Sequence, residues 1–214
     1  MFINKLFAYV TFICKKYEID ESHGLSHSMN VLNHAQNIYN SELGKNPFLE
    51  AQQKIIYTAA ILHDMCDKKY IDETEGVQMI TEYIKDDVTL NELDVIKTII
   101  KTMSYSKVTV FGYPMLGEYM LAYHIVREAD LLSAYDFNRC MIYGINKKTN
   151  CKTIMDSFVE SRKLFNYRVL RYIDDGLFIT DYSKFISKAL HEESIKSIKL
   201  WEQLYSYKID VEIM

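Results

Sequence analysis

The stretch AAILHDMCDKKY, residues 59–70, joins an apolar helical run to an abrupt polar pair. Its first four residues are small or apolar and are expected to pack a helix into the core, and His63-Asp64 follows at the C-terminal end. A buried imidazole and a buried carboxylate need partners, and a divalent metal ion satisfies both. Because adjacent helical residues point about 100° apart, both side chains reach one ion only if it lies beside the helix end. The stretch therefore predicts a buried helix and makes His63 and Asp64 candidate metal ligands, although a His-Asp pair by itself is common in proteins.

The composition favours one helical domain. The chain has 214 residues, of which 49% are hydrophobic, and this is enough to bury a sizeable core. Only 7 Gly and 2 Pro occur, so long helices with short connections are expected. No stretch has the composition of a linker, and residues 1–214 are predicted to form a single all-α helical bundle. Apolar residues recur at helical spacing near residues 3–17, 26–42, 47–66, 73–85, 89–103, 115–135, 152–173 and 181–207.

Capping and turn residues mark several of these boundaries. The expected helix starts are Ser26, Pro47, Asp72 with Glu75, and Thr180 or Asp181, and the expected stops are Gly44 and Gly176. The β-branched residues at 108–110 precede a Gly-Tyr-Pro turn. This pattern favours a loop or a short extended piece over residues 108–112.

The charge balance and the cysteines narrow the class of function. A formal charge of −4, with Lys and Arg spread along the chain, predicts no binding of duplex nucleic acid and fits a small phosphorylated substrate better. The 4 cysteines lie far apart without CxxC spacing, which indicates reduced thiols and a cytoplasmic protein. The apolar stretch 6–14 is too short to cross a bilayer and is followed by Lys15 and Lys16. It predicts a core helix and no membrane association.

Two residues in other helical stretches extend the His63-Asp64 pair into a metal site. They are His27 and Asp130, and Asp130 stands in an apolar context where a carboxylate is costly unless it is coordinated or hydrogen-bonded. His27, His63, Asp64 and Asp130 make a mixed nitrogen and oxygen set typical of one divalent ion with open positions for water and substrate. Manganese is the first choice, with Mg²⁺, Co²⁺, Ni²⁺, Zn²⁺ and Fe²⁺ as alternatives. The set predicts a metal-dependent hydrolase.

Charged residues near these ligands are candidates for contact with substrate. Asp67 lies one helical turn beyond the histidine of the pair and could orient or deprotonate an attacking water. Lys68 and Lys69 could meet phosphate oxygens, although lysines at a helix end commonly only solvate it. Arg127 could bind substrate or form a structural salt bridge. His23 could contact substrate or serve as a capping residue.

Four motifs carry a resemblance to a known family. They are SHGLSH at 22–27, LHDMCDKKY at 62–70, TMSYS at 102–106 and READLLSAY at 127–135. In this order they are similar to the S-H-D-x-x-H, L-H-D-I-x-D-x-K-[FY], I-S-F-S and x-D-A-D-x-L-x-A elements of a small bacterial and viral branch of the HD-domain superfamily. This superfamily consists of metal-dependent phosphohydrolases. The resemblance spans residues 20–136 of the chain.

The resemblance implies an HD-type helical fold with the ligands named above around one ion. It also implies that Asp67 positions or activates the attacking water and that Lys69 contacts phosphate. Two departures are visible, because Gly24 stands where the branch has an acidic residue and Glu128 where an aspartate is common. The expected activity is hydrolysis of a nucleotide or related phosphate ester, by a pyrophosphohydrolase or a phosphomonoesterase, with Asp64, Asp67 and Lys69 as catalytic residues.

Two alternative functions stay open. The first is a catalytically idle HD-like domain that senses a nucleotide or binds a protein partner, although the ligands and Asp67 are all intact. The second is a diiron oxygenase. That reading needs a second set of ligands, for which only His124 is available.

Residues from 151 to 214 are expected to form a helical extension outside the resemblance. Trp201 lies there with Leu200, Leu204 and Tyr205 in an apolar helical patch. The patch is expected to pack onto the rest of the domain, and a homodimer interface is the alternative.

Overall fold

The described residues fold into helices joined by short connections, with no strand among them. The computed structural model describes residues 2–146 and 151–212, with side chains up to residue 206. The all-α prediction is therefore confirmed for this part of the chain. The elements are α1 (Phe2–Tyr17), α2 (Leu25–Leu43), η1 (Pro47–Gln52), α3 (Gln53–Leu62), α4 (Glu73–Ile84), α5 (Leu90–Thr102), α6 (Tyr105–Phe111), η2 (Gly117–Tyr119), α7 (Met120–Ser133), α8 (Phe137–Asn146), α9 (Ile154–Tyr167), η3 (Val169–Arg171) and α10 (Asp181–Glu212).

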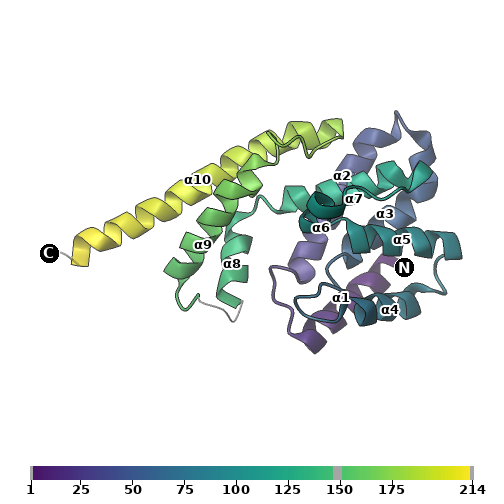
Figure 1. The fold of residues 1–214 in the computed structure, drawn as a ribbon, viewed down its shortest axis with the longest axis horizontal. Helices are drawn as coiled ribbons and strands as arrows, with labels where there is room; N and C mark the ends of the chain where they lie inside the picture. The colour runs from purple at the N-terminus through teal and green to yellow at the C-terminus, as the bar shows by residue number, and fades with distance from the viewer. Residues whose placement is uncertain (1, 147–150, 213–214) are drawn as a thin grey trace.

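The helices form two groups that lie side by side. The first seven helices make a bundle, and α8, α9 and the long α10 make a second group next to it, with the start of α10 lying over the bundle (Figure 1). Helix α3 is central to the bundle and packs against α1, α2, α5 and α7. Its position explains why the residues that follow it lie deep in the protein.

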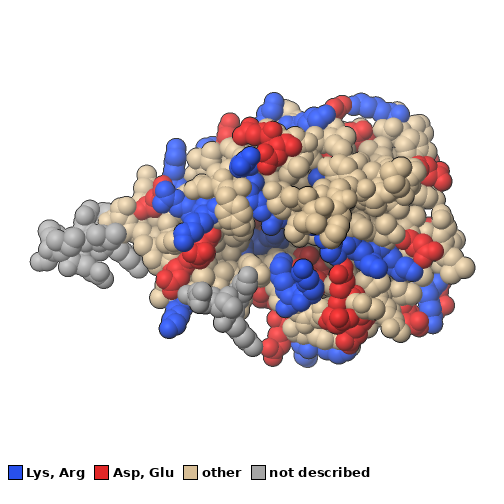
Figure 2. All heavy atoms as spheres, in the orientation of Figure 1, with Lys and Arg blue, Asp and Glu red and all other residues tan. Residues whose placement is uncertain are grey.

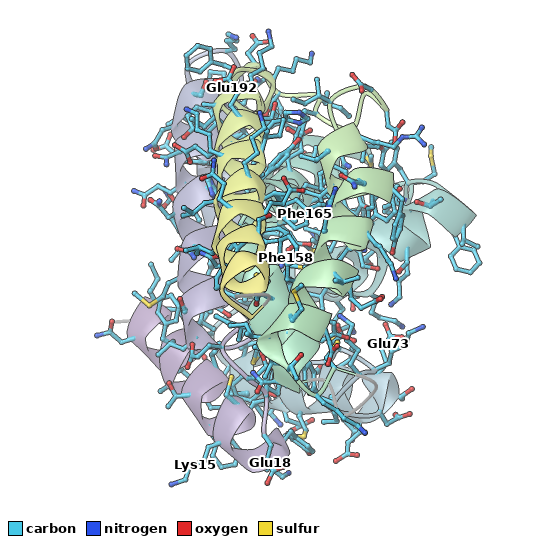
Figure 3. The ribbon with its side chains drawn as sticks, turned by 90° about the vertical axis from the view of Figure 1, so that its left-hand side faces the viewer. Lys15, Glu18, Glu73, Phe158, Phe165 and Glu192 are labelled. Carbon is cyan, nitrogen blue, oxygen red and sulfur yellow. The ribbon has the colours of Figure 1, made fainter. Side chains whose placement is uncertain are left out.

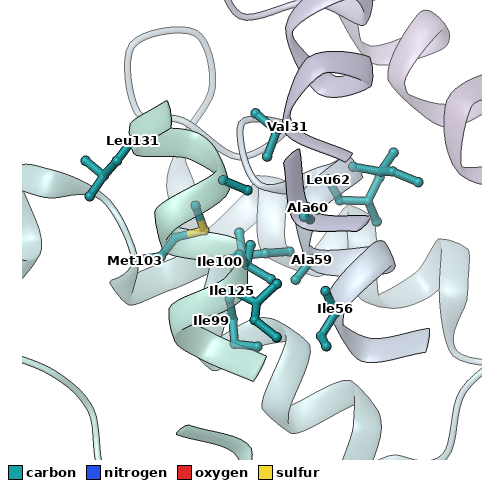
Figure 4. Packing of buried hydrophobic residues seen from close by; sticks show 14 of the residues in the cluster. Val31, Ile56, Ala59, Ala60, Leu62, Ile99, Ile100, Met103, Ile125 and Leu131 are labelled. Carbon is teal, nitrogen blue, oxygen red and sulfur yellow. The ribbon is translucent and has the colours of Figure 1, made fainter. Parts of the chain in front are cut away.

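The sequence of α3 accounts for its central place. Nearly every residue from Ile55 to Leu62 is fully buried, and Ala59 and Ala60 leave room for neighbouring helices to approach closely. Figure 4 shows these alanines facing Ile99 and other apolar side chains of α5 and α7. The predicted buried helix before the His-Asp pair is thus confirmed.

Local capping agrees with several predicted helix starts. Asp72 accepts hydrogen bonds from the backbone N–H groups of Thr74 and Glu75, 3.0 Å in each case, and so begins α4. Pro47 stands in the first turn of η1, and α10 begins at Asp181. These starts follow the predicted positions.

Two segments differ from the sequence prediction. Residues 108–112 do not form a loop or an extended piece, because α6 is helical from Tyr105 to Phe111 and ends at Gly112, whose φ is +74°. β-branched residues favour extended strands that pair with a neighbouring strand. The described residues contain no strand that could pair with this segment, and no residue of α6 is buried. Helix α8 is also absent from the prediction. It is only 10 residues long and buries just Phe137 and Met141, one turn apart.

Aromatic residues hold the second group of helices together. Phe137 of α8 contacts Phe158 and Phe165 of α9, with ring centroids 5.9 and 5.0 Å apart. Figure 3 shows Phe158 and Phe165 between α9 and α10. Tyr205 of α10 packs on Phe158 at 5.3 Å, and the indole N–H of Trp201 donates to Asn138 Oδ1 at 3.0 Å. Trp201 and Tyr205 thus contact α8 and α9, whereas Leu200 and Leu204 are 55% and 51% exposed, and the homodimer interface stays a prediction.

A buried carboxylate fixes the start of α10 on the bundle. Glu128 of α7 is 0% exposed and accepts three hydrogen bonds, from the backbone of Ile179 at 2.7 Å and from the backbone and hydroxyl of Thr180 at 3.2 and 2.7 Å. These bonds satisfy a charge that would otherwise be costly to bury. Glu128 therefore joins the two groups of helices. None of the described helices combines the length and apolar character that a bilayer crossing needs.

Candidate metal centre

The chain turns sharply where α3 ends, and this turn presents both residues of the His-Asp pair to one point. Helix α3 stops at Leu62, and the backbone N–H of Met65 donates to the Leu62 carbonyl at 3.0 Å. His63 keeps helical dihedral angles, with φ −56° and ψ −35°, and the regular helical hydrogen bonds give way to this tighter turn over residues 63–66. The predicted placement of the ion beside the helix end is consistent with this turn.

Side chains from α2, this turn and α7 converge in a compact cluster. Nε2 of His27 lies 3.1 Å from Nε2 of His63 and 3.3 Å from Oδ2 of Asp64. Oδ1 of Asp130 lies 3.4 Å from Nε2 of His27 and 3.7 Å from Nε2 of His63. The ligand atoms of His27, His63 and Asp64 all lie within 4.8 Å of one another, so these three residues could hold a metal ion.

The polar atoms of the cluster fit a divalent cation. Bonds of about 2.1 Å to nitrogen and oxygen place neighbouring ligand atoms about 3.0–3.4 Å apart, close to the separations seen here. Oδ2 of Asp64 is buried and has no hydrogen-bond partner among the described residues. Nδ1 of His63 donates to the carbonyl of Ala60 at 2.9 Å, so Nε2 is the ring nitrogen that faces the cluster.

The electrostatics of the cluster also favour a bound cation. Burial disfavours a charge on His63, but Asp64 and Asp130 outweigh it and raise the pKa of His63 to about 9. Burial likewise opposes ionisation of the two carboxyls, yet the neighbouring imidazoles hold the pKa of each well below its usual value. The two carboxylates therefore stay ionised and attract positive charge, which a divalent ion can supply.

Asp67, Lys69 and His23 form a hydrogen-bonded group at the edge of the same pocket. The carboxylate of Asp67 accepts from the backbone N–H of Lys69 at 2.9 Å and pairs with its Nζ at 3.0 Å. The same Nζ lies 3.1 Å from Nε2 of His23, whose Nδ1 contacts the hydroxyl of Ser22 at 2.8 Å. Burial and the charge of Lys69 contribute to lowering the pKa of His23 to about 4. Lys68 is exposed and also lines the pocket.

Arg127, one of the candidate substrate contacts, lies outside the pocket in the structure. Its side chain is buried, does not line the pocket, and donates to the carbonyl of Leu177. It lies 3.5 Å from Glu128 and over the ring of Tyr113. Arg127 therefore anchors the segment before α10 through this bond to Leu177.

The pocket contains residues that the sequence analysis missed. It has a volume of about 290 Å³, and its far side is lined by Lys107 of α6, Arg139 and Tyr143 of α8, and Arg168 at the end of α9. Figure 2 shows Lys and Arg side chains gathered around a hollow near the middle of this face. The guanidinium of Arg139 contacts Nδ1 of His27, so this wall reaches the cluster itself. The only sign of this wall in the sequence was that Arg139 lies in one amphipathic stretch and Arg168 at the end of another.

The described residues contain no second metal group. His124 lies among the rings of Tyr113 and Tyr123, at 4.9 and 5.5 Å, and not beside the cluster. Within residues 2–146 and 151–206, ligand atoms come this close together only at the cluster that contains His27, His63 and Asp64. The diiron alternative therefore gains no support.

Comparison with known proteins identifies the fold and no family. Neither a scan against protein-family models nor a search of curated proteins found a match. Among solved structures, the chain is similar to the crystal structure of a protein from Lactobacillus plantarum, a Northeast Structural Genomics target, with a TM-score of 0.67. The two share 17% identity over 96% of this chain and 97% of that chain. A likeness at this identity shows a shared fold alone.

Proposed function

We propose that the protein is a metal-dependent phosphohydrolase of the HD type that acts on a nucleotide or a related phosphate ester. The observation that carries the proposal is the convergence of His27, His63, Asp64 and Asp130 on one point at the base of a pocket lined by lysines and arginines. Such ligands suit Mn²⁺ first, and the cationic walls suit a phosphorylated substrate. The resemblance of the four sequence motifs to the HD-domain superfamily supports the same class.

The chain's own residues have distinct roles in this reaction. A divalent ion at the cluster would supply Lewis acidity and lower the pKa of an attacking water. Asp67, held by the backbone of Lys69, orients that water and accepts its proton as the water oxygen bonds to phosphorus. The bond from phosphorus to the leaving oxygen breaks in the same reaction. Lys69 and Arg139 offset the negative charge that develops on the phosphoryl oxygens.

Metal content and product release test the proposal together. The full-length chain, loaded in turn with Mn²⁺ and other divalent ions, is assayed for phosphate and pyrophosphate release from nucleoside mono-, di- and triphosphates. We expect turnover in the wild type and the loss of both metal retention and turnover in Asp64→Asn. Asp94→Asn is the matched control, because Asp94 is exposed on α5 and pairs only with Lys97.

The outcomes separate the enzyme from its main alternative. Nucleotide binding without turnover under every ion would favour a catalytically idle sensor. Full turnover in Asp64→Asn would contradict the mechanism, because the cluster would then be dispensable.

A further inference from the structure

The arginines of the chain fall into two groups according to their partners. Arg127, Arg162 and Arg171 each lie within 3.5 Å of a carboxylate oxygen. Arg139 and Arg168 form no ion pair with any described side chain, and both line the pocket. The two unpaired guanidinium groups are thus the two that face the candidate metal centre.

This pairing pattern points to an anionic ligand. The chain carries a formal charge of −4, so carboxylates are plentiful, yet none of the described ones pairs with Arg139 or Arg168. Two like charges held in one half-buried pocket repel each other unless an anion lies between or beside them. Guanidinium groups bind phosphate oxygens through two parallel N–H donors, which gives both affinity and orientation.

Arg139 is placed to meet the phosphate that lies at the metal. Its backbone N–H donates to Oδ1 of Asp136 at 3.0 Å, which fixes the first turn of α8. Its guanidinium contacts Nδ1 of His27, on the side of the ring away from the cluster. Arg139 lines the same pocket as the four candidate ligands, so its guanidinium is available to a phosphoryl group bound in that pocket.

Arg168 is held on a different part of the wall. Its Nε donates to the hydroxyl of Tyr172 at 3.0 Å, and its guanidinium lies 4.1 Å above the ring of Tyr105. It contacts none of the four candidate ligands, and no described group accepts a hydrogen bond from its two terminal nitrogens. This fixed guanidinium has donors free for a ligand farther along the pocket.

Cys140 shows that the two arginines share one stretch of wall. Burial raises the pKa of its thiol, and a hydrogen bond to Ser161 and the charges of Arg139 and Arg168 partly offset that rise. Both guanidinium groups therefore lie close to the same side chain. Arg139 contacts His27 of the cluster, Arg168 contacts none of the four candidate ligands, and Cys140 lines the pocket with both.

We propose that Arg168 binds a second phosphate group of the substrate while the cluster and Arg139 hold the phosphate that is hydrolysed. The substrate class is then a nucleoside di- or triphosphate or another phosphoanhydride, and not a monophosphate. This inference rests on the proposed function and specifies its substrate. The volume of about 290 Å³ agrees with a small phosphorylated molecule.

A binding experiment tests the second phosphate site without turnover. The full-length chain, in a constant excess of Mn²⁺, is titrated with methylenediphosphonate and with methylphosphonate by calorimetry. We expect the wild type to bind the diphosphonate about tenfold more tightly. Arg168→Gln should remove this preference and leave methylphosphonate binding unchanged. Arg171→Gln, at an exposed arginine three residues away that pairs with Asp175, should keep it.

Several results would overturn the inference. If the wild type binds the two ligands with equal affinity, the inference is wrong. This result needs no variant, so the test holds even if Arg168→Gln does not fold. An equal loss of affinity for both ligands in Arg168→Gln would place Arg168 at the hydrolysed phosphate instead.

In Arg168→Lys, which keeps the charge but not the paired donors, part of the preference for the diphosphonate should return.

Comparison with turnover separates this inference from the proposed function. If diphosphonate selectivity depends on Arg168 but no nucleotide is hydrolysed, the second phosphate site stands and the hydrolase proposal falls. If nucleotides are hydrolysed but Arg168→Gln raises KM no more than Arg171→Gln does, the hydrolase stands and the second site falls.

Discussion

The two walls of the pocket differ in how their charges are neutralised. On the ligand wall, two carboxylates and two imidazoles lie 3.1–3.7 Å apart and satisfy one another once a cation is bound. On the arginine wall, two guanidinium groups have no acidic partner among the described side chains. The first wall contains three residues that could hold a metal ion, whereas we propose that the second binds an anionic ligand. The ligand wall consists of His27, His63, Asp64 and Asp130, and the arginine wall of Arg139 and Arg168.

The largest effect is expected on the ligand wall. Asp130→Asn removes a charge from the cluster, so the retained metal should fall well below one ion per chain and hydrolysis should fall by at least about 100-fold. Metal analysis after gel filtration and a phosphate-release assay measure the two quantities. Asp94→Asn, on the exposed face of α5, is the control. Full metal retention in Asp130→Asn would remove Asp130 from the ligand set.

Replacing Asp67 should lower the rate of hydrolysis without lowering the metal content. Asp67→Asn keeps the size of the side chain but cannot accept the proton, so kcat should fall about 10²- to 10⁴-fold. The metal content should stay at the wild-type level, because Asp67 pairs with Lys69 and lies outside the cluster. Steady-state kinetics and metal analysis on the same preparation check both points. Loss of the metal would make Asp67 a ligand, and an unchanged kcat would exclude it as the base.

A smaller effect, on stability alone, is expected at Arg127. Arg127→Gln leaves the carbonyl of Leu177 without its donor, so the free energy of unfolding should fall by about 1–3 kcal/mol. KM for the substrate should not change, because Arg127 lies outside the pocket. Denaturant unfolding and steady-state kinetics measure the two effects. An increased KM at unchanged stability would restore Arg127 as a substrate contact.

A last effect is a dependence of stability on pH that arises outside both walls and is expected only toward acid pH. Burial, followed by the charge of Arg127, lowers the pKa of His124 to about 4, from about 6.5 in the unfolded chain. Neutral His124 therefore contributes stability above pH 6.5 that is lost as the pH falls toward 4. In His124→Gln this part of the pH dependence should be absent. Thermal unfolding across this range checks it, and parallel curves for the two proteins would contradict the assignment.

The ligand wall could be predicted from the sequence because its residues interrupt apolar runs. His63 and Asp64 follow the buried residues of α3, and Asp130 stands among buried residues of α7. A charged group in such a place is costly unless it has a partner, so the sequence itself marks it. His27 was a candidate from its helical stretch, and the resemblance to HD motifs supported it. The sequence indicated that some turn must bring His63 and Asp64 to one point. It did not predict the geometry of that turn.

The arginine wall could not be predicted, because its role depends on tertiary placement. Arg139 lies in α8, whose two buried residues are too few to give a clear helical period, and Arg168 lies where α9 ends. An arginine in a short amphipathic helix is ordinarily solvated. Only the packing of α8 and α9 beside the bundle brings these two into the pocket. Conversely, Arg127 is adjacent in sequence to the predicted site but is directed to the segment before α10.

The most direct measurement is the position of a bound ion. Crystals of the full-length chain grown with Mn²⁺, with diffraction data collected for anomalous scattering, locate the ion independently of any activity. We predict one anomalous peak about 2.1 Å from Nε2 of His27 and His63 and from a carboxylate oxygen of Asp64 and Asp130. A peak elsewhere, or none at these four side chains under saturating Mn²⁺, would contradict the assignment of this cluster as the metal centre.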